Sequence, residues 1–387
     1  PTYDKADGFF GDYAIRVYVG GEAVTFVQER AARALDAPVA LTRAETDGGL
    51  VVSTLDFVPW TDGPERSCFV RLVSVEGRIA AETVIVVDPH NVTAVSGDAI
   101  VERRSSRTLT TRAGTPGATA STTGLIVPVP TDAPSEHVVL HCAGGESPAE
   151  AIVADLDTVD TWIGETAVAY QAWASRLTTF ELPDVSLQHF VDGMKQTLIT
   201  QTTHDGATCP MSQYSRTWAR DNIGPALAWL QFGGHDELRA MIDYVYSAIL
   251  RQGDFANSYP ADIPVDLTVP PPNWEALPTL APRVAAETPS YMVWILGAYT
   301  QATGDLSLAT SRWGYVRRAL WAQAFDALDL LPFTDDETYR AAMNAAFGLA
   351  LEFPHGEQSQ SANSSFLWLG AARWYAAMAE WTGRAAD

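Results

Sequence analysis

The sequence predicts an α+β fold of more than one domain, in which an antiparallel β-sandwich is followed by a linker helix and a toroid of helical hairpins. Three observations predict this fold. The chain has 387 residues, which is more than one ordinary core usually holds. Its first part is rich in Val, Thr and Ile in short alternating runs, and the apolar period becomes helical after Ser147. Hydrophobic residues make up 47% and charged residues 19%, so we expect a large buried core.

Residues 1–145 are expected to form the sandwich. Runs such as YAIRVYVGG, CFVRLVSVEG and AETVIVVDP alternate in polarity and are separated by Gly, Pro and Asp at intervals of roughly ten residues. The small, polar run SSRTLTTRAGTPGATASTTG is typical of a hairpin-rich or flexible stretch. Paired carboxylates, metal-ligand spacing and glycine-rich phosphate loops are missing from this part of the sequence. We therefore expect it to be a scaffold.

Residues 146–183 are expected to form a helical linker. Ser147 can cap a helix, Glu150 lies three residues on, and the amphipathic pattern continues from there. Residues 184–387 then show helical periods at 186–203, 218–232, 236–251, 289–303, 308–327 and 364–383. Short turns such as FGGHDE and TGDLS alternate with the long connections 204–217, 252–287 and 328–363. This alternation predicts inner and outer helices, with a binding site on the rim that carries the long connections.

Charge and cysteine content exclude several classes of function. The chain carries 25 Lys and Arg against 47 Asp and Glu, a net charge of −22, with no basic patch. Nucleic acid and anionic membranes are therefore not expected as partners. No apolar run approaches the ~20 residues that span a membrane. The three cysteines, Cys68, Cys142 and Cys209, match no metal or redox spacing, so we expect neither a disulfide framework nor a metal or cofactor.

The N-terminus leaves the location of the protein open. The chain starts at Pro1 without an initiator Met and enters strand-like sequence almost at once, which suggests a trimmed or partial chain. The absence of a signal-type segment favours the cytoplasm, and a trimmed N-terminus would allow secretion.

The first long connection carries the best binding motif. In SQYSRTWARDN, the residues Arg216, Trp218, Arg220 and Asp221 crowd a junction between a loop and a helix. A guanidinium beside a carboxylate can bind vicinal hydroxyls of a sugar, and a Trp ring can cover its apolar face. In the alternative interpretation, Asp221 caps the helix and pairs with an arginine, while Trp218 lies in the core.

The other two long connections supply further candidates. The second is proline-rich and is expected to form a cleft wall; it contains Asp254, Asn257, Tyr259, Asp262 and Trp274, and it ends at Glu287, which faces either the cleft or a helix dipole. The third holds clustered acids beside apolar residues, where one carboxyl can serve as a general acid: Asp335, Asp336, Glu337, Glu352 and Glu357, with His355. Alternatively, Thr334 caps a helix that Asp335, Asp336 and Glu337 begin.

The order of sandwich, linker helix and helical hairpins, together with W-x-R-D at Trp218, Arg220 and Asp221 and ATGD at 302–305, resembles the glucoamylase-like glycoside hydrolases and the related disaccharide phosphorylases. The resemblance implies an (α/α)6 barrel in which Arg220 and Asp221 hold sugar hydroxyls. It also implies a general acid between the fifth and sixth helices. The Trp-Glu-Glu string of glucoamylases is missing there, so the acid is Glu337 from its LLP context or Glu357 from its position before the last helix; we favour Glu337.

The resemblance implies twelve helices, and this sequence contains half of them, so the toroid is expected to be incomplete. Either the chain is a fragment, or a partner, a second copy or a second polypeptide, completes the toroid, or a half barrel has another role. The general base stays unassigned. The expected activity is that of an inverting glycoside hydrolase that acts from the end of a neutral oligosaccharide or glycoside, with Tyr259, Trp274, Arg216 and Asp336 as further substrate contacts. The alternatives are an inverting disaccharide phosphorylase and a carbohydrate-binding relative without activity.

Overall fold

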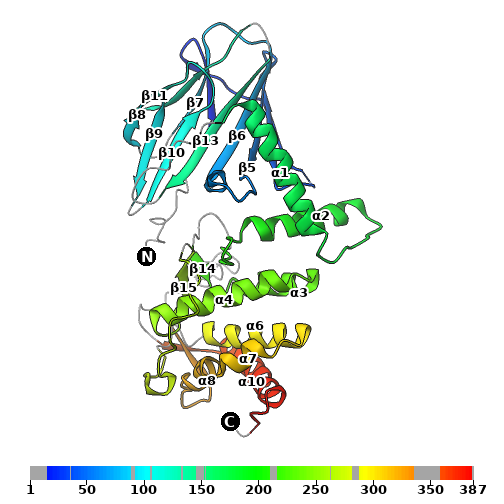
Figure 1. Cartoon of the computed structure of the whole chain (residues 1–387), viewed down its shortest axis with the longest axis vertical. Coiled ribbons are helices and arrows are strands. Elements are labelled where there is room, and N and C mark those ends of the chain that lie inside the picture. The colour runs from blue at the N-terminus through cyan, green and yellow to red at the C-terminus, as the bar shows by residue number, and fades with distance from the viewer. Residues whose placement is uncertain are drawn as a thin grey trace. The chain divides into compact units, whose positions relative to one another are not determined.

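The chain folds into two compact units, one formed by Pro1–Thr200 and the other by Gln201–Asp387. Our computed structural model (Figure 1) describes residues 15–34, 36–88, 92–104, 107–131, 134–144, 152, 154–209, 216–261, 263–280, 287–334 and 358–385. In the part of the chain that the structure describes, the first unit contains two antiparallel sheets, two α-helices and the short 3-10 helix η2 (Pro64–Ser67), and the helices of the second unit belong to a partial toroid that closes no barrel. The predicted α+β class is therefore confirmed. The predicted domain boundaries after residues 145 and 183 stay predictions.

The sandwich consists of a five-stranded sheet with the order β11-β12-β7-β1-β2 and an eight-stranded sheet with the order β3-β4-β5-β6-β13-β10-β9-β8. All its strand pairs are antiparallel. The strands are β1 (Ile15–Val19), β2 (Glu22–Ala23), β3 (Gln28–Arg33), β4 (Ala40–Glu45), β5 (Leu50–Phe57), β6 (Cys68–Gly77), β7 (Thr83–Val87), β8 (Val92–Ser96), β9 (Ala99–Arg104), β10 (Arg107–Ala113), β11 (Thr119–Ser121), β12 (Gly124–Pro128) and β13 (Ser135–Gly144). The polar stretch expected to be hairpin-rich contributes β10, β11 and the start of β12.

Alternation along β6 builds two apolar layers. Val73 and Val75 point into the core between the sheets, where they meet residues of β7 and β12 such as Ile85 and Leu125. Val70 and Leu72 belong to a second cluster on the opposite face. Successive side chains of a strand point to opposite faces, so β6 is covered on both sides.

Helix α1 (Leu156–Ala174) covers that second face through Val159 and Trp162. The helix begins later than predicted. Asp155, rather than Ser147, is its N-cap, and its side chain accepts a hydrogen bond of 2.9 Å from the backbone N–H of Thr158. Ser147 and Glu150 lie outside the described residues, and Ile152 and Ala154 are not helical. The Asp155 side chain satisfies a free backbone N–H at the start of the helix, which is the role that the sequence assigned to Ser147.

Helix α2 (Val185–Thr200) also bonds to the sandwich. The side-chain amide of Gln196 donates to the backbone carbonyls of Ala34 and Ala37, at 2.5 and 3.1 Å, and the Arg33 guanidinium donates to the Thr197 hydroxyl at 2.9 Å. These contacts explain why α2 belongs to the first compact unit.

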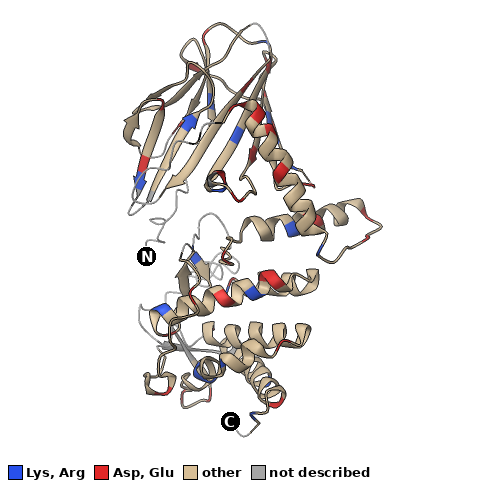
Figure 2. Ribbon diagram, viewed as in Figure 1, with Lys and Arg blue, Asp and Glu red and all other residues tan. Residues whose placement is uncertain are grey.

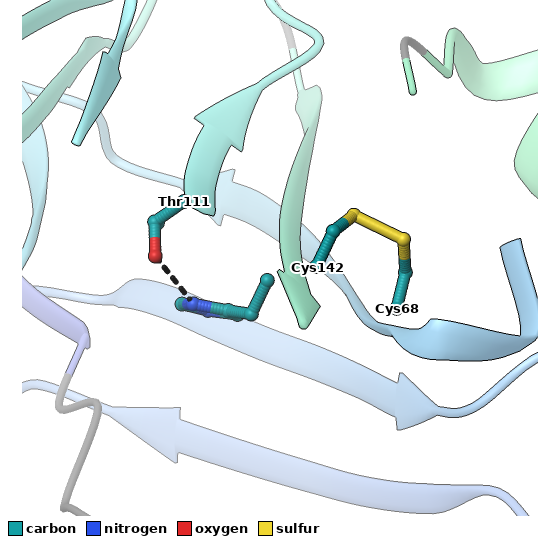
Figure 3. Close-up of a disulfide and its surroundings, with 4 residues drawn as sticks. Cys68, Thr111 and Cys142 are labelled. Carbon is teal, nitrogen blue, oxygen red and sulfur yellow. Dashed lines mark hydrogen bonds between the residues drawn. A yellow bond between two sulfur atoms is a disulfide. The ribbon is translucent and has the colours of Figure 1, made fainter. Parts of the chain in front are cut away.

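A disulfide joins Cys68 to Cys142 (Figure 3). The sequence spacing predicted no disulfide framework, and it did not indicate this single bond. The two cysteines are 74 residues apart in the sequence and stand opposite each other in the β6–β13 register. Sequence spacing could not indicate the pair because only the register of two distant strands brings it together. Cys209 is a free thiol.

The second unit contains α3 (Ile223–Phe232), α4 (His235–Gln252), α6 (Thr288–Thr303), α7 (Ser307–Ser311), α8 (Trp313–Trp321) and α10 (Ala362–Trp381). Short segments lie between them: β14 (Arg216–Trp218), β15 (Ser258–Pro260), η3 (Trp274–Ala276), β16 (Leu331–Thr334) and β17 (Gln358–Ser361). The predicted turns at FGGHDE and TGDLS are confirmed. Gly233 and Gly304 end α3 and α6 in the left-handed conformation, with φ of 70° at both. The helix predicted over 308–327 is divided into α7 and α8 and ends at Trp321.

Helices α6 and α10 run parallel. At two levels, a glycine of one helix packs against a tryptophan of the other. Gly297 packs against the Trp374 ring, and Gly370 packs against the Trp294 ring. The two rings meet edge to face, with centroids 6.1 Å apart. The parallel direction places the N-termini of these helices at one end of the unit.

Charged residues of both signs are spread over both units (Figure 2). Helix α1 carries three acidic residues, Asp157, Asp160 and Glu165, and no basic one. No helix among the described residues is long and apolar enough to cross a membrane.

Candidate functional site

Two short strands bring the first and second long connections together. β14 pairs with β15 in antiparallel register, with Thr217 opposite Tyr259 and Trp218 opposite Ser258. The Arg216 guanidinium donates to the Ser258 hydroxyl at 2.9 Å and to the Ser258 carbonyl at 3.2 Å. Arg216, which the sequence predicts as a substrate contact, therefore stabilises the pairing of β14 with β15.

The W-x-R-D motif forms a strand end and a turn, and α3 begins only at Ile223. Asn222 is buried at the N-cap, and both its backbone N–H and its side-chain amide donate to the carbonyl of Trp218, at 3.1 and 2.7 Å. The helix predicted to start at residue 218 is thus shortened, because the residues before 219 pair with β15. Trp218 is half-buried and Asp221 is exposed, so both side chains reach the surface of the unit.

Arg220 extends from this turn to the start of α6. Its Nη1 lies 3.4 Å from Oε2 of Glu287, and their side chains are 21% and 8% exposed. Glu287 is the N-cap residue of α6. The carboxylate is thus close to the positive end of that helix and to a guanidinium, two features that stabilise a buried anion.

Asn257 links the starts of α3 and α6. Its backbone carbonyl accepts a hydrogen bond of 3.3 Å from the N–H of Ala219, and its side-chain oxygen accepts one of 3.3 Å from the Thr288 hydroxyl. Ala219 precedes Arg220, and Thr288 follows Glu287. The second long connection therefore fixes how far apart the arginine and the glutamate lie.

Tyr259 is completely buried, and its hydroxyl accepts a hydrogen bond of 3.0 Å from the N–H of Ala256. Burial raises the pKa of this phenol well above its usual range. The ring has no surface to offer a ligand in this structure, although the sequence predicted a substrate contact. The residue packs the connection in place.

Trp274 forms part of a wall on α8. Its indole lies against Gly314, where an added Cβ would come within 2.8 Å of the ring, and it meets Tyr315 edge to face. Trp274 is half-buried, and its predicted contact with substrate stays a prediction. Its contacts given by the structure are with α8 and not with the Arg220 turn.

Arg318 of α8 forms hydrogen bonds with the second long connection. The guanidinium pairs with both carboxylate oxygens of Asp254 and donates to the carbonyls of Leu277 and Pro278, at 3.4 and 2.7 Å. With only 4% of its side chain exposed, this arginine is a structural anchor.

The third long connection begins and ends in paired strands, β16 and β17, in which Thr334 stands opposite Gln358. The N–H of Leu331 donates to the hydroxyl of Ser365 in the first turn of α10, at 3.0 Å. The described ends of the connection therefore lie at the N-terminal end of α10. Asp335, Asp336, Glu337, Glu352, His355 and Glu357 lie outside the described residues, as does Asp262. Among the described residues, no cluster of His, Cys, Asp or Glu could hold a metal ion.

The sequence placed Arg220 and Asp221 in the binding set and left Glu287 undecided between a cleft and a helix dipole. In the structure, Glu287 lies at the start of α6, and Arg220 reaches the same helix start. Asn257 was recognised only as a member of the loop. Its role depends on a strand pair between segments 42 residues apart, which no local pattern reports.

Neither a family model nor a curated protein matches this sequence. Solved structures do match. A bacterial glucoamylase in complex with acarbose aligns with 96% of this chain at a TM-score of 0.60 and 11% identity. A protein described as a kojibiose phosphorylase, from the human microbiome, aligns with 93% of it at a TM-score of 0.54 and 9% identity.

The chain spans only 58% and 59% of the length of these two proteins. At such low identity the likeness shows a shared fold. The class of protein that the fold defines is thus a β-sandwich joined to a glucoamylase-type helical toroid, and the expected resemblance is confirmed at that level.

Proposed function

We propose that this protein is a carbohydrate-active enzyme, an inverting glycoside hydrolase that acts from the end of a neutral oligosaccharide or glycoside. The observation that carries the proposal is the position of the Trp218–Asp221 turn. It lies where the starts of α3 and α6 meet, in a fold shared with a glucoamylase whose structure holds acarbose.

Three side chains of the turn, those of Trp218, Arg220 and Asp221, have a role in this proposal. The Arg220 guanidinium donates hydrogen bonds to hydroxyl oxygens of a sugar, and the Asp221 carboxylate accepts hydrogen bonds from neighbouring hydroxyls. The half-buried Trp218 ring covers the C–H face of the pyranose. Trp274 on the second connection and Asp336 on the third are proposed as further substrate contacts.

Glu337 is proposed as the general acid, with Glu357 as the second catalytic carboxyl candidate. In an inverting mechanism the acid protonates the leaving oxygen, while a second carboxylate activates a water on the opposite face of the sugar. The two carboxyl groups are about 6.5–9.5 Å apart. The general base remains unassigned.

The test combines product release with binding. Unactivated disaccharides of glucose, mannose and galactose in both anomers serve as substrates, because their sugar leaving group needs a proton, and acarbose and kojibiose serve as calorimetric ligands. We expect Glu337→Gln to lower kcat by about 10²–10⁴-fold, because an amide cannot donate the proton, while saccharide binding persists. Unchanged turnover in this variant would remove Glu337 from the mechanism. Glu357→Gln is tested in parallel, and Glu275→Gln, at an 80% exposed side chain, is the control.

A disaccharide phosphorylase is the second candidate, since the fold is also shared with the kojibiose phosphorylase described above. It predicts release of a sugar 1-phosphate that depends on added phosphate. A third candidate, an inactive carbohydrate-binding protein, predicts ligand-dependent thermal stabilisation without product on any glycoside.

A further inference from the structure

We propose that Glu287 is a positioning residue that holds Arg220 in the orientation needed to bind a sugar hydroxyl. This inference rests on the proposed function, because it takes Arg220 as the group that contacts the sugar. Burial of the Glu287 carboxylate supports this role. A carboxylate with 8% of its side chain exposed needs a compensating charge, and Arg220 Nη1 lies 3.4 Å away.

The Glu287 side chain does not cap its own helix. It occupies the N-cap position of α6, but its side chain forms no capping hydrogen bond, and its backbone has φ −139° and ψ −45°. The carboxylate is instead directed to the turn that precedes α3. The start of α6 still favours a negative charge there, so the anion is stabilised from both sides.

Neighbouring residues hold Arg220 and Glu287 at this distance. Asn257 accepts a hydrogen bond from Ala219, next to Arg220, and another from Thr288, next to Glu287. The arginine and the glutamate are thus held by one residue on the intervening connection. A side chain anchored in this way loses less conformational entropy when it binds a ligand.

The arrangement also suits a neutral ligand. Arg220 keeps 21% of its side chain exposed, and Glu287 balances its charge from the buried side. An uncharged hydroxyl can then accept a hydrogen bond from the guanidinium without an unbalanced charge in the site.

A double-mutant cycle on saccharide affinity tests the inference. The 387-residue chain is prepared as wild type, Glu287→Gln, Arg220→Gln and the double variant, and calorimetry measures the affinity of each for acarbose and for kojibiose. We expect Glu287→Gln to weaken binding by about 10-fold or more and Arg220→Gln to weaken it at least as much. The double variant should bind no more weakly than Arg220→Gln alone. Glu275→Gln, which removes the partner of Arg317 in an exposed pair at 3.2 Å, should leave the affinity unchanged.

Three outcomes decide against the inference, and they differ. Wild-type affinity in Glu287→Gln overturns the positioning role and leaves the proposed function intact. Weaker binding on adding Glu287→Gln to Arg220→Gln shows that Glu287 contacts the sugar itself, which also overturns the role. Absence of saccharide binding by the wild type overturns the proposed function, and the inference falls with it. If thermal melting shows that Glu287→Gln is unfolded, Glu287→Asp, which keeps the charge on a shorter side chain, takes its place in the same cycle.

Discussion

His141 lies inside the sandwich with a side chain that is almost completely buried. The Thr111 hydroxyl and His141 Nδ1 form a hydrogen bond of 3.0 Å (Figure 3). Arg71 is the charged neighbour, and it pairs with Asp56 at 2.7 Å. Burial, followed by the positive charge of Arg71, lowers the pKa of His141 to about 3.

The sandwich should therefore lose stability in mild acid. His141 is neutral in the folded chain and titrates near 6.5 when unfolded, so the unfolded chain takes up a proton that the folded chain does not. The contribution of neutral His141 to the free energy of unfolding is fully present above pH 6.5. It should fall by about 1.4 kcal/mol for each pH unit between 6.5 and the pKa of the folded chain.

Denaturant unfolding at a series of pH values measures this slope. His141→Gln should flatten it, whereas His204→Gln, at a 90% exposed side chain, should not. An equal acid slope in wild type and His141→Gln would contradict the assignment.

At the scale of elements, the contact between α6 and α10 depends on small residues beneath large rings. A Cβ at Gly297 would lie 2.7 Å from Cγ and Cδ2 of Trp374 and 2.8 Å from its Cβ. These atoms belong to the base of the side chain, so they cannot move away without shifting a helix.

We expect Gly297→Ala to destabilise the chain by about 1–3 kcal/mol, because overpacking outweighs the better helix propensity of alanine. Chemical denaturation measures the change. Gly224→Ala in α3 is the matched control, since nothing lies within 4 Å of its added Cβ. It should be neutral or gain up to about 1 kcal/mol. A stabilised Gly297→Ala variant would mean that α6 and α10 pack less closely than described.

The start of α3 shows how an element can be decided by a distant partner. Residues 218–222 carry a helical pattern locally, but Arg216–Trp218 hydrogen-bonds to Ser258–Pro260 and becomes a strand. Because of this pairing, Arg220 and Asp221 occupy a turn rather than a helical face. That turn puts Arg220 within reach of Glu287.

At the scale of the whole molecule, the division after Thr200 assigns both α1 and α2 to the sandwich. Helix α1 covers an apolar face formed by residues such as Val70, Leu72, Val138 and Leu140. A sandwich without α1 would expose this face to water, and the free energy of folding would lose about 25 cal/mol for each Å² of apolar surface exposed.

We therefore expect a fragment of residues 1–200 to unfold cooperatively, and a fragment of residues 1–145 to bind a hydrophobic dye and unfold without a sharp transition. Calorimetry and dye fluorescence distinguish the two. Trp162→Ala within the longer fragment is a graded control, and it should cost about 3–5 kcal/mol if α1 packs as described. Equal stability of the two fragments would show that α1 is dispensable for the sandwich.

The sequence by itself determined the features that depend on local pattern. Alternation identified the antiparallel sheets, helical periods identified most of the helices, and glycines such as Gly233 and Gly304 marked the turns, because backbone preference and side-chain periodicity are local properties. The W-x-R-D motif also directed attention to the turn that now carries the proposed site.

Only the tertiary structure decided which distant residues meet. Cys68 and Cys142 are joined by strand register across 74 residues, and Arg220 reaches Glu287 across 67. Tyr259 looked accessible in a polar, proline-rich segment and is completely buried by its pairing with β14. Such contacts depend on register and packing between separate elements, and a single sequence carries no local trace of either.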